Sequence, residues 1–438
     1  MANAAGKDRG AAPAPHLDPL PEGRGDARRA RRVPLWIWAL AVTSVMQVES
    51  AFLTIAMTVI GPTLTDAAGV PAERIGQLTA ISSFGTMLFL LTGGPLLVRY
   101  GPLRLLQLGA LLGAAALALS AALGWSGGWW PSFLAASLLV GIAYGPSPPA
   151  GSDILQRHAP VGRRSLVFSI KQAAAPLGGA LAGLVVPPLA TLYGWRAALA
   201  VAALLAAAAT LAAQPWRETL DAGRDPTRRM HLGALLSPAA LAAPFRALGL
   251  APILPRLTYL AFSFAVVQGC LLGFYVTYMV ADVGMPLETA GIAFAVLQGT
   301  GVVARVCVGW IADRVGSAFA TLNVLALGSV ATALGTAAIA PGWPLAAILA
   351  AGIASGFAAT SWNGVYMGEV ARMAPPGKIG DATSGSTFLT FIGYVLGPLV
   401  FSAVVEHTGS YRIAFVLTAL LPLSALALLR AKRRGGAR

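Results

Sequence analysis

Long apolar runs recur along almost the whole chain. A helix that spans a bilayer needs about 20 mostly apolar residues, because the hydrocarbon core is about 30 Å thick and each residue rises about 1.5 Å. Such runs lie at 34–62, 75–98, 102–124, 129–151, 165–191, 195–214, 256–281, 287–312, 317–340, 343–368, 382–405 and 411–430. They are apolar on every side and do not alternate with period two, so a membrane β-barrel is not expected. The sequence predicts an all-α membrane protein with twelve transmembrane helices.

Charged residues are scarce and unevenly placed. They make up 11% of the chain, whereas a soluble domain carries roughly 25%, which excludes an ordinary soluble enzyme. Of the 31 Lys and Arg residues, 26 fall in the two tails or the even-numbered loops, and only Arg74, Arg196 and Arg412 fall in the opposite loops. Short cytoplasmic loops retain basic residues. We therefore expect both termini to be cytoplasmic and the helices to cross the inner membrane, and we interpret the net charge of +14 as a topology signal rather than a nucleic-acid site.

The longest polar interruption lies near the middle of the chain. We predict a disordered basic cytoplasmic tail at 1–33, an N-terminal six-helix bundle at 34–214, a cytoplasmic central loop at 215–254, a C-terminal six-helix bundle at 255–430 and a basic cytoplasmic tail at 431–438. The only cysteines, Cys270 and Cys307, both lie within predicted helices. Neither a disulfide framework nor a thiolate metal site is expected, and no cofactor or metal is predicted.

Two short segments repeat at about half the length of the chain. The segment from Gly94 to Gly101 matches the segment from Gly309 to Gly316 at a shift of 215 residues. Arg196-Ala197-Ala198 matches Arg412-Ile413-Ala414 at a shift of 216. Both pairs fall at equivalent places in a six-plus-six arrangement, which predicts two pseudo-symmetric bundles related by an axis along the membrane normal.

These features together resemble the major facilitator superfamily. The motif Gly-x-x-x-Asp-Arg-x-Gly at 309–316, the duplicated halves, the basic central loop and the Pro-Leu-Gly-Gly run at 176–179 carry the resemblance. It implies alternating access, with Asp313 and Arg314 forming a cytoplasmic latch that helps to hold the outward-facing state. The first copy has Val98 where the family has Asp, so a latch there is expected to be weakened or replaced. The residues expected to act in gating are Gly94, Arg99, Gly101, Gly309, Asp313, Arg314 and Gly316.

Three ionisable residues fall deep inside predicted helices: Glu49, Lys171 and Arg305. Each costs about 2.5–3.5 kcal/mol at the bilayer centre, so each needs a reason to be there. The guanidinium of Arg305 can bind a carboxylate through two hydrogen bonds, which points to an anionic substrate. Its context, Ala304-Arg305-x-x-x-Gly309, resembles the helix-8 segment of monocarboxylate transporters and of oxalate/formate antiporters. The alternatives are that Arg305 extends to the cytoplasmic interface or supports the neighbouring loop.

The other two groups also have alternative interpretations. Lys171 either adds a second positive charge to the substrate cavity or extends its flexible stem to the interface. Glu49 lies too deep to extend easily. A carboxyl group in a low dielectric can exchange a proton near neutral pH, which is what a proton-coupled carrier needs. The alternatives for Glu49 are a structural ion pair with Lys171 or Arg305, and packing against backbone donors.

Uncharged polar and aromatic residues accompany these charges within the helices. Buried amides and hydroxyls need hydrogen-bond partners, which either a substrate cavity or a neighbouring helix can supply. In addition to Lys171 and Arg305, the predicted substrate-binding residues are Gln47, Gln172, Tyr144, Tyr275, Gln298, Trp362, Asn363 and Tyr366, with Gln268 as a further polar neighbour.

The sequence favours a proton-coupled secondary transporter of a small organic anion. A carboxylate is the preferred class of substrate. Efflux of drugs or metabolites is the alternative within transporters, and a non-transporting membrane receptor or scaffold is the alternative outside them. All four histidines lie in tails or loops, and the chain has neither a His-Glu-x-x-His motif nor a phosphate-binding Gly-x-x-x-x-Gly-Lys loop. Neither an enzyme nor an ATP-driven pump is therefore expected. The expected partners are the substrate, protons and the lipid bilayer, with no nucleic acid, and we expect a monomer.

Overall fold

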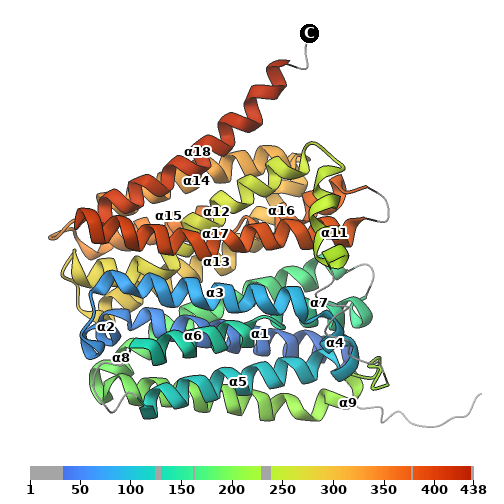
Figure 1. Cartoon of the computed structure of the whole chain (residues 1–438), viewed down its shortest axis with the longest axis horizontal. Helices are drawn as coiled ribbons and strands as arrows, with labels where there is room; N and C mark the ends of the chain where they lie inside the picture. Colours follow the sequence, from blue (N-terminus) through green and yellow to red (C-terminus); the bar gives the residue numbers. More distant parts are fainter. Residues whose placement is uncertain (1–32, 124–129, 161–162, 228–237, 376–377, 436–438) are drawn as a thin grey trace, which may run out of the picture. The chain divides into compact units, whose positions relative to one another are not determined.

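The computed structural model describes residues 33–123, 130–160, 163–227, 238–375 and 378–435. The chain divides into two units, Met1–Pro34 and Leu35–Arg438. The first coincides with the predicted tail, and all of it except residues 33 and 34 lies outside the described residues. In the second unit, every regular element in the described ranges is helical, which confirms the predicted all-α membrane fold (Figure 1).

The N-terminal predicted bundle begins with the long helix α1 and ends with α8. Its elements are α1 (Leu35–Val59), α2 (Gly61–Ala68), η1 (Ala72–Arg74), α3 (Ile75–Thr92), α4 (Gly94–Tyr100), α5 (Pro102–Leu123), α6 (Trp130–Tyr144), α7 (Ser147–His158) and α8 (Arg164–Ala213). Several predicted spans are thus built from two elements, because Gly-Pro pairs at 61–62, 94–95 and 145–146 interrupt the helical hydrogen bonding.

Helix α8 contains two of the predicted spans. At about 1.5 Å per residue, its 50 residues would make a straight helix about 75 Å long, far more than a bilayer needs. Gly194 lies within it with φ 82° and ψ 157°, outside the helical region. This residue separates the predicted helices at 165–191 and 195–214. With the segment Leu166–Leu220 taken as one, the described residues contain eleven candidate spans, and the division of this segment at Gly194 accounts for the difference from the twelve predicted.

The predicted central loop is partly helical. It contains η4 (Gln214–Trp216), α9 (Arg217–Leu220) and α11 (Pro238–Gly249), while residues 228–237 lie outside the described ranges. The C-terminal bundle consists of α12 (Leu254–Ala281), α13 (Leu287–Val315), α14 (Ala318–Ala338), α15 (Leu345–Ala359), α16 (Asn363–Met373), α17 (Ile379–Thr408) and α18 (Tyr411–Gly435). Helix α18 runs five residues past the predicted end at 430, because Ala, Lys and Arg favour a helix until the glycines are reached. The last three residues of the predicted C-terminal tail are not described.

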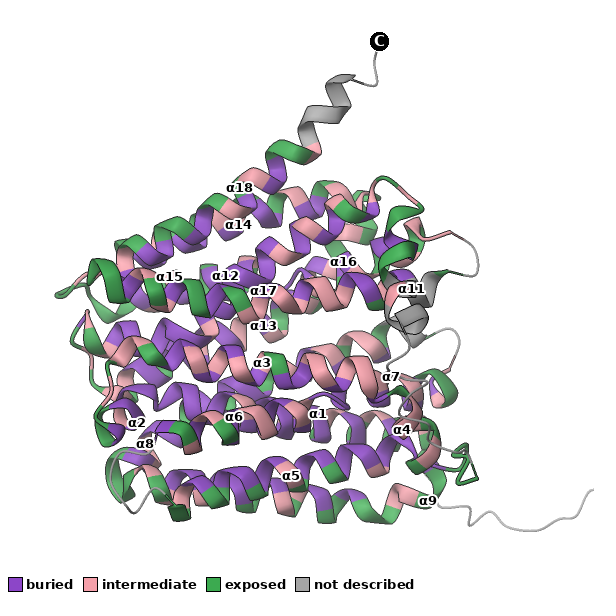
Figure 2. Cartoon of the chain, in the orientation of Figure 1, coloured by how far each residue is buried: buried purple, intermediate pink, exposed green. Residues whose placement is uncertain are grey.

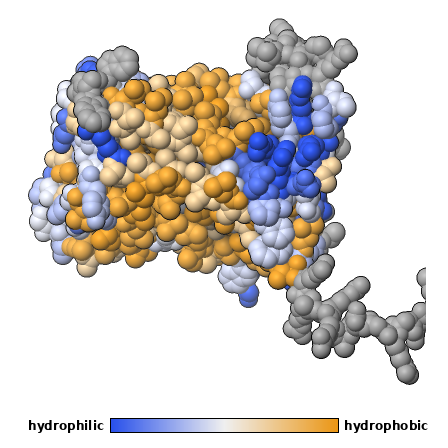
Figure 3. Space-filling view, turned by 90° about the horizontal axis from the view of Figure 1, so that it is seen from below, coloured by the Kyte–Doolittle hydropathy of each residue, from blue (hydrophilic) through white to orange (hydrophobic). Residues whose placement is uncertain are grey.

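The surface of the bundle is suited to lipid. A broad apolar belt separates two ends that carry the hydrophilic residues (Figure 3). Large apolar side chains of α8 are well exposed, among them Leu204 at 69% and Leu211 at 73%. Helix α12, by contrast, is buried over most of its length (Figure 2). Exposed leucine on this scale is favourable in hydrocarbon and unfavourable in water, so the belt supports a membrane location.

The two bundles meet most closely along two helix pairs, α8 with α13 and α3 with α17. Glycines allow the approach: a Cβ at Gly183 would lie 2.8 Å from the carbonyl oxygen of Gly291. At the same end, the Ser402 hydroxyl donates to the carbonyl of Glu73, and η1 packs against α12 and α17. Helices α7 and α16, at the other end, make their main contacts within their own bundles. The bundles are thus in closer contact at the η1 end than at the α7–α16 end.

Two membrane helices are broken at equivalent positions. The span Trp130–His158 is interrupted between α6 and α7, and the span Leu345–Met373 between α15 and α16, about 215 residues later. The first break follows from Gly145-Pro146. At the second, the hydroxyls of Thr360 and Ser361 donate back to the carbonyls of Gly356 and Phe357, a bonding pattern that bends helices. Each break frees backbone carbonyls inside the membrane, and these need hydrogen-bond donors.

Candidate functional site

Lys171 donates hydrogen bonds to the backbone carbonyls at the break between α6 and α7. Its side chain is only 1% exposed, and its Nζ donates to the carbonyls of Ser147 at 3.1 Å and Pro148 at 3.4 Å. Gly151 leaves room for it, since a Cβ at that position would lie 2.6 Å from the Lys171 Cε. Lys171 therefore does not extend to the interface, and that interpretation is wrong for this conformation.

Arg305 donates a hydrogen bond to a backbone carbonyl at the break between α15 and α16, and a second one to the other bundle. From α13, its Nε donates to the carbonyl of Thr360 at 3.1 Å, and its Nη1 donates to the carbonyl of Gln172 on α8 at 2.7 Å. The side chain keeps some exposed surface. Nothing in the described residues links it to Asp313 by a hydrogen bond or ion pair. A guanidinium has five N–H donors, and the two bonds above leave N–H groups for a further acceptor.

Two positive charges thus lie near each other where the bundles meet. Lys171 and Arg305 are close enough to interact electrostatically. Among the described residues, ion pairs join Arg157 to Asp153, Arg372 to Glu369 and Arg412 to Asp282, for example. None of them provides a carboxylate to Lys171 or Arg305. Both cations are held by backbone carbonyl dipoles, and the described residues provide neither with a paired counter-ion.

Glu49 is buried on α1, which packs extensively against α8. Its Oε2 accepts a long hydrogen bond of 3.4 Å from the Ser50 hydroxyl, while its Oε1 has no hydrogen-bond partner among the described residues. No ion pair in these ranges joins it to Lys171 or Arg305, so the alternative of a structural ion pair is not realised in this conformation. Thr43, which borders Gly151 beside Lys171, precedes Glu49 by six residues, or about 9 Å of helical rise.

Tyrosines surround Arg305 on both sides of the bundle interface. Tyr144, the last residue of α6, accepts a hydrogen bond of 3.2 Å from the Gln47 amide, and both Tyr144 and Tyr394 lie within electrostatic range of Arg305. Tyr394 donates to the Oε1 of Gln268 at 2.9 Å. Tyr394 was not among the predicted residues. A tyrosine within the apolar run 382–405 was the available signal.

The remaining predicted substrate residues divide into three groups. Gln298 and Tyr275 each have a buried side-chain oxygen without a partner in the described ranges, as an unfilled polar site would. Trp362 donates from its indole Nε1 to Gln268 at 3.0 Å, and the Tyr366 hydroxyl bonds to Ser386. These two are fully engaged between helices. The side chains of Gln172 and Asn363 are partly exposed.

The two predicted gating turns differ. Helix α13 continues through Asp313 and Arg314, which are both exposed, and ends at Gly316 with φ 65°. Nothing in the described residues forms an ion pair with Asp313. Arg314 lies over the ring of Trp310 at 5.1 Å. A Cβ at Gly309 would meet no described atom within 4 Å, so close packing does not explain this glycine. The predicted second-half latch is thus not closed in this conformation.

The first-half turn has an acid from another part of the chain. Gly101 takes φ 93°, and the carboxylate of Asp221 lies against it. Asp221 accepts hydrogen bonds from the backbone N–H groups of Leu103 at 2.7 Å and Arg104 at 3.0 Å. These are among the free donors at the start of α5. Asp221 therefore stabilises the turn that lacks an acid at Val98, a role that was not predicted for it.

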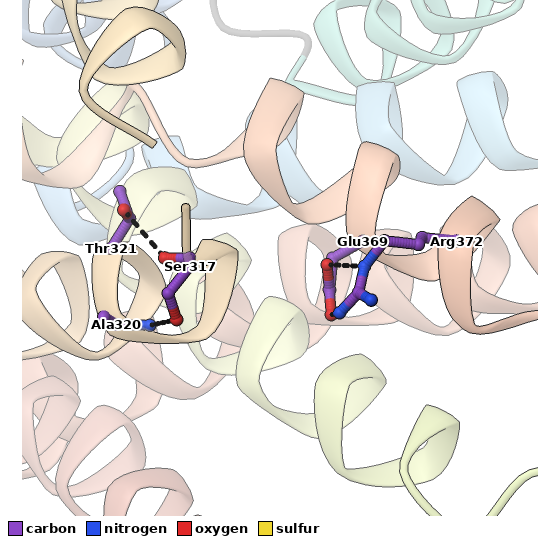
Figure 4. Close-up of polar contacts among 5 residues, drawn as sticks. All are labelled: Ser317, Ala320, Thr321, Glu369 and Arg372. Carbon is purple, nitrogen blue, oxygen red and sulfur yellow. Dashed lines mark hydrogen bonds and ion pairs between the residues drawn. The ribbon is translucent and has the colours of Figure 1, made fainter. Parts of the chain in front are cut away.

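Intrahelical ion pairs repeat beyond the two breaks. Asp153 pairs with Arg157 on α7, and Glu369 pairs with Arg372 on α16 at 2.6 Å (Figure 4). The same view shows Ser317 capping α14 by accepting from the Ala320 N–H at 3.2 Å. These pairs lie within single helices, so they do not join the bundles. The described residues hold no cluster of three or more metal-ligating side chains.

Known proteins resemble the chain along most of its length. The family model of the Major Facilitator Superfamily matches residues 42–371. An uncharacterised MFS-type transporter of Mycobacterium tuberculosis is 29% identical over 89% of this chain and 84% of its own. Monocarboxylate transporter 11 of Mus musculus is 30% identical over 63% of each chain. The 4-hydroxybenzoate transporter of Pseudomonas aeruginosa is 26% identical over 60% of this chain and 62% of its own.

A solved structure confirms the arrangement of the helices. A bacterial homologue of the human lysosomal transporter Spinster, in an inward-facing and occupied conformation, superposes with a TM-score of 0.70. The superposition covers 92% of this chain and 98% of that one at 15% sequence identity. At this level of identity the likeness concerns the fold alone.

Proposed function

The chain belongs to the Major Facilitator Superfamily of transporters, and from that premise we propose that it moves a small organic anion, a carboxylate, by proton-coupled alternating access. The observation that carries this proposal is the pair of cations, Lys171 and Arg305, that donate to backbone carbonyls and have no paired carboxylate in the described residues. Desolvated charges are costly unless they are paired. A substrate carboxylate is the counter-ion that this arrangement lacks.

The geometry supports a carboxylate in contact with Arg305. The N–H groups that Arg305 does not donate to Gln172 and Thr360 are available to an anion. The hydroxyls of Tyr144 and Tyr394 come from opposite bundles and lie in electrostatic range of the same guanidinium. Hydrogen bonds to a charged group contribute about 1.5–3 kcal/mol each. An anion bound here contacts both bundles and both helix breaks, so its presence stabilises their closure around it.

The conformation fits one state of such a cycle. The bundles are packed together at the η1 end, while α7 and α16 at the other end remain within their own bundles. The end with α7 and α16 is the one whose loops carry the basic residues, which predicts that it is cytoplasmic. On that assignment the structure corresponds to an inward-facing state. The unpaired Asp313 supports the same assignment, because the latch is expected to close in the outward-facing state.

Glu49 is the group we propose for proton coupling. Its Oε1 lacks a partner in the described part of the chain, so the carboxyl is not committed to an ion pair. A proton bound there removes a buried negative charge from α1, about 9 Å of helical rise from Thr43, which lies beside Lys171. Protonation and anion binding thus favour each other through charge balance, as symport requires.

The proposal is tested by uptake into proteoliposomes with an acidic outside. Radiolabelled 4-hydroxybenzoate, lactate and glucuronate serve as carboxylate probes, and tetraphenylphosphonium serves as a cation probe. We expect at least one carboxylate to accumulate faster with the proton gradient than without it, and the cation not to accumulate. Accumulation of the cation when the gradient is reversed, with an acidic inside, and no movement of any carboxylate would instead establish the efflux alternative.

A further inference from the structure

A second basic site lies at the end of the membrane spans, away from the bundle interface. A pocket with a volume of about 320 Å³ is lined by Arg99, Tyr100, Arg104, Arg217, Arg224 and Pro226. Arg99 and Arg104 flank the start of the α5 span, and Arg217 and Arg224 flank the end of the α8 span. The guanidinium groups therefore lie where the hydrocarbon core gives way to the headgroup region.

The wall of the pocket is held in place by several contacts. The segment after α9 is fixed to the turn before α5, because Asp221 accepts from Leu103 and Arg104 and the N–H of Asp225 donates to the carbonyl of Val98 at 2.8 Å. Gly223 lies against the guanidinium of Arg157. The pocket is thus preformed from two parts of the chain that are more than 100 residues apart.

The described residues that line the pocket include four arginines and no acidic side chain. Burial raises the pKa of the Asp221 carboxyl, while its two backbone hydrogen bonds and the nearby charges of Arg217 and Arg224 oppose that rise. The Nε of Arg217 is buried and has no hydrogen-bond partner in the described ranges. An anion with several acceptor oxygens would satisfy this donor and also contact the other arginines of the lining.

We infer that this pocket binds a phosphate group, supplied either by the headgroup of an anionic phospholipid or by a soluble phosphate compound. Arginine clusters favour phosphate, because the planar guanidinium matches its oxygens through paired hydrogen bonds. Basic pockets at the cytoplasmic ends of membrane helices bind such headgroups. The site is separate from Lys171 and Arg305, so it is independent of the substrate proposal.

The test uses the purified full-length chain in neutral detergent and native mass spectrometry. Phosphatidylglycerol and inorganic phosphate are the two anionic probes, and phosphatidylcholine is the zwitterionic comparison. We expect phosphatidylglycerol to bind at least tenfold more tightly to the wild type than to the Arg104→Gln/Arg217→Gln double variant. Arg196→Gln serves as the matched control, because Arg196 is exposed beside Trp195 in one of the predicted opposite loops, and it should bind like the wild type.

The two phosphate sources give different results. If a lipid headgroup is the ligand, inorganic phosphate does not displace phosphatidylglycerol. If a soluble phosphate is the ligand, inorganic phosphate binds the wild type at least tenfold more tightly than the double variant and competes with the lipid. Equal binding of both probes to the wild type, the double variant and Arg196→Gln would overturn the inference. If the double variant does not fold, Arg224→Gln replaces it, since Arg224 is exposed and its loss should still weaken binding.

Discussion

Replacing Arg305 by alanine is expected to abolish carboxylate uptake in proteoliposomes. The substitution removes the guanidinium that lies between Gln172, Thr360 and the two tyrosine hydroxyls. One hydrogen bond to a charged group contributes about 1.5–3 kcal/mol, and about 1.4 kcal/mol corresponds to a tenfold change in affinity. Loss of a single such bond therefore weakens binding by about tenfold to a hundredfold. Initial rates of uptake at a fixed substrate concentration measure the effect.

A second variant separates binding from folding. Arg305→Ala also removes two interhelical hydrogen bonds, so its unfolding temperature must be compared with that of the wild type. Arg305→Lys keeps the positive charge but loses the planar donor set, and it should retain a normal fold and bind the carboxylate weakly. Arg196→Ala is the control. It removes an exposed arginine in one of the predicted opposite loops, and this variant should transport normally. Normal carboxylate uptake by Arg305→Ala would show that the anion binds elsewhere.

Replacing Glu49 by glutamine is expected to remove proton-driven accumulation while leaving substrate exchange. Glutamine has almost the same shape as glutamate and can keep the contact with Ser50, but it cannot exchange a proton. The variant should therefore equilibrate substrate in both directions and fail to concentrate it when the outside is acidic. Accumulation under a proton gradient and exchange without a gradient are measured on the same liposomes.

The matched control for this variant is Glu406→Gln. Glu406 is exposed near the end of α17, so the same chemical change there should leave both activities unaltered. Gradient-driven accumulation at the wild-type level by Glu49→Gln would assign the coupling proton to another group. Loss of exchange together with accumulation would mean that Glu49 is needed to hold the structure of the site.

Most of the fold was predicted from the lengths of the apolar runs and from the glycines and prolines that interrupt them. The predicted runs correspond to helices in the structure, because a membrane span must satisfy its own backbone hydrogen bonds. The boundary between the runs 165–191 and 195–214 was predicted, and Gly194 marks it in the structure with φ 82° and ψ 157°, outside the helical region. The length of α18 beyond 430 and the helices in the central loop were missed, because polar segments give no apolar periodicity there.

Site residues could be predicted only where placing their charge inside the membrane costs free energy. Glu49, Lys171 and Arg305 were found because a charge in a membrane needs a reason. Their partners were not found, since backbone carbonyls such as those of Ser147 and Thr360 leave no signal in side-chain chemistry. Asp221 was missed for a different reason: it lies about 120 residues from the turn it stabilises, and only the folded chain brings the two together.

The most direct test of the central claim compares an acid with its amide. A carboxylate and the matching uncharged amide, such as 4-hydroxybenzoate and 4-hydroxybenzamide, have nearly the same shape and differ in the charge that Arg305 and Lys171 are proposed to neutralise. Using whichever acid the wild type transports, we predict that excess unlabelled acid inhibits labelled uptake and that the amide does not. Equal inhibition by the amide would contradict an anion site at these two residues.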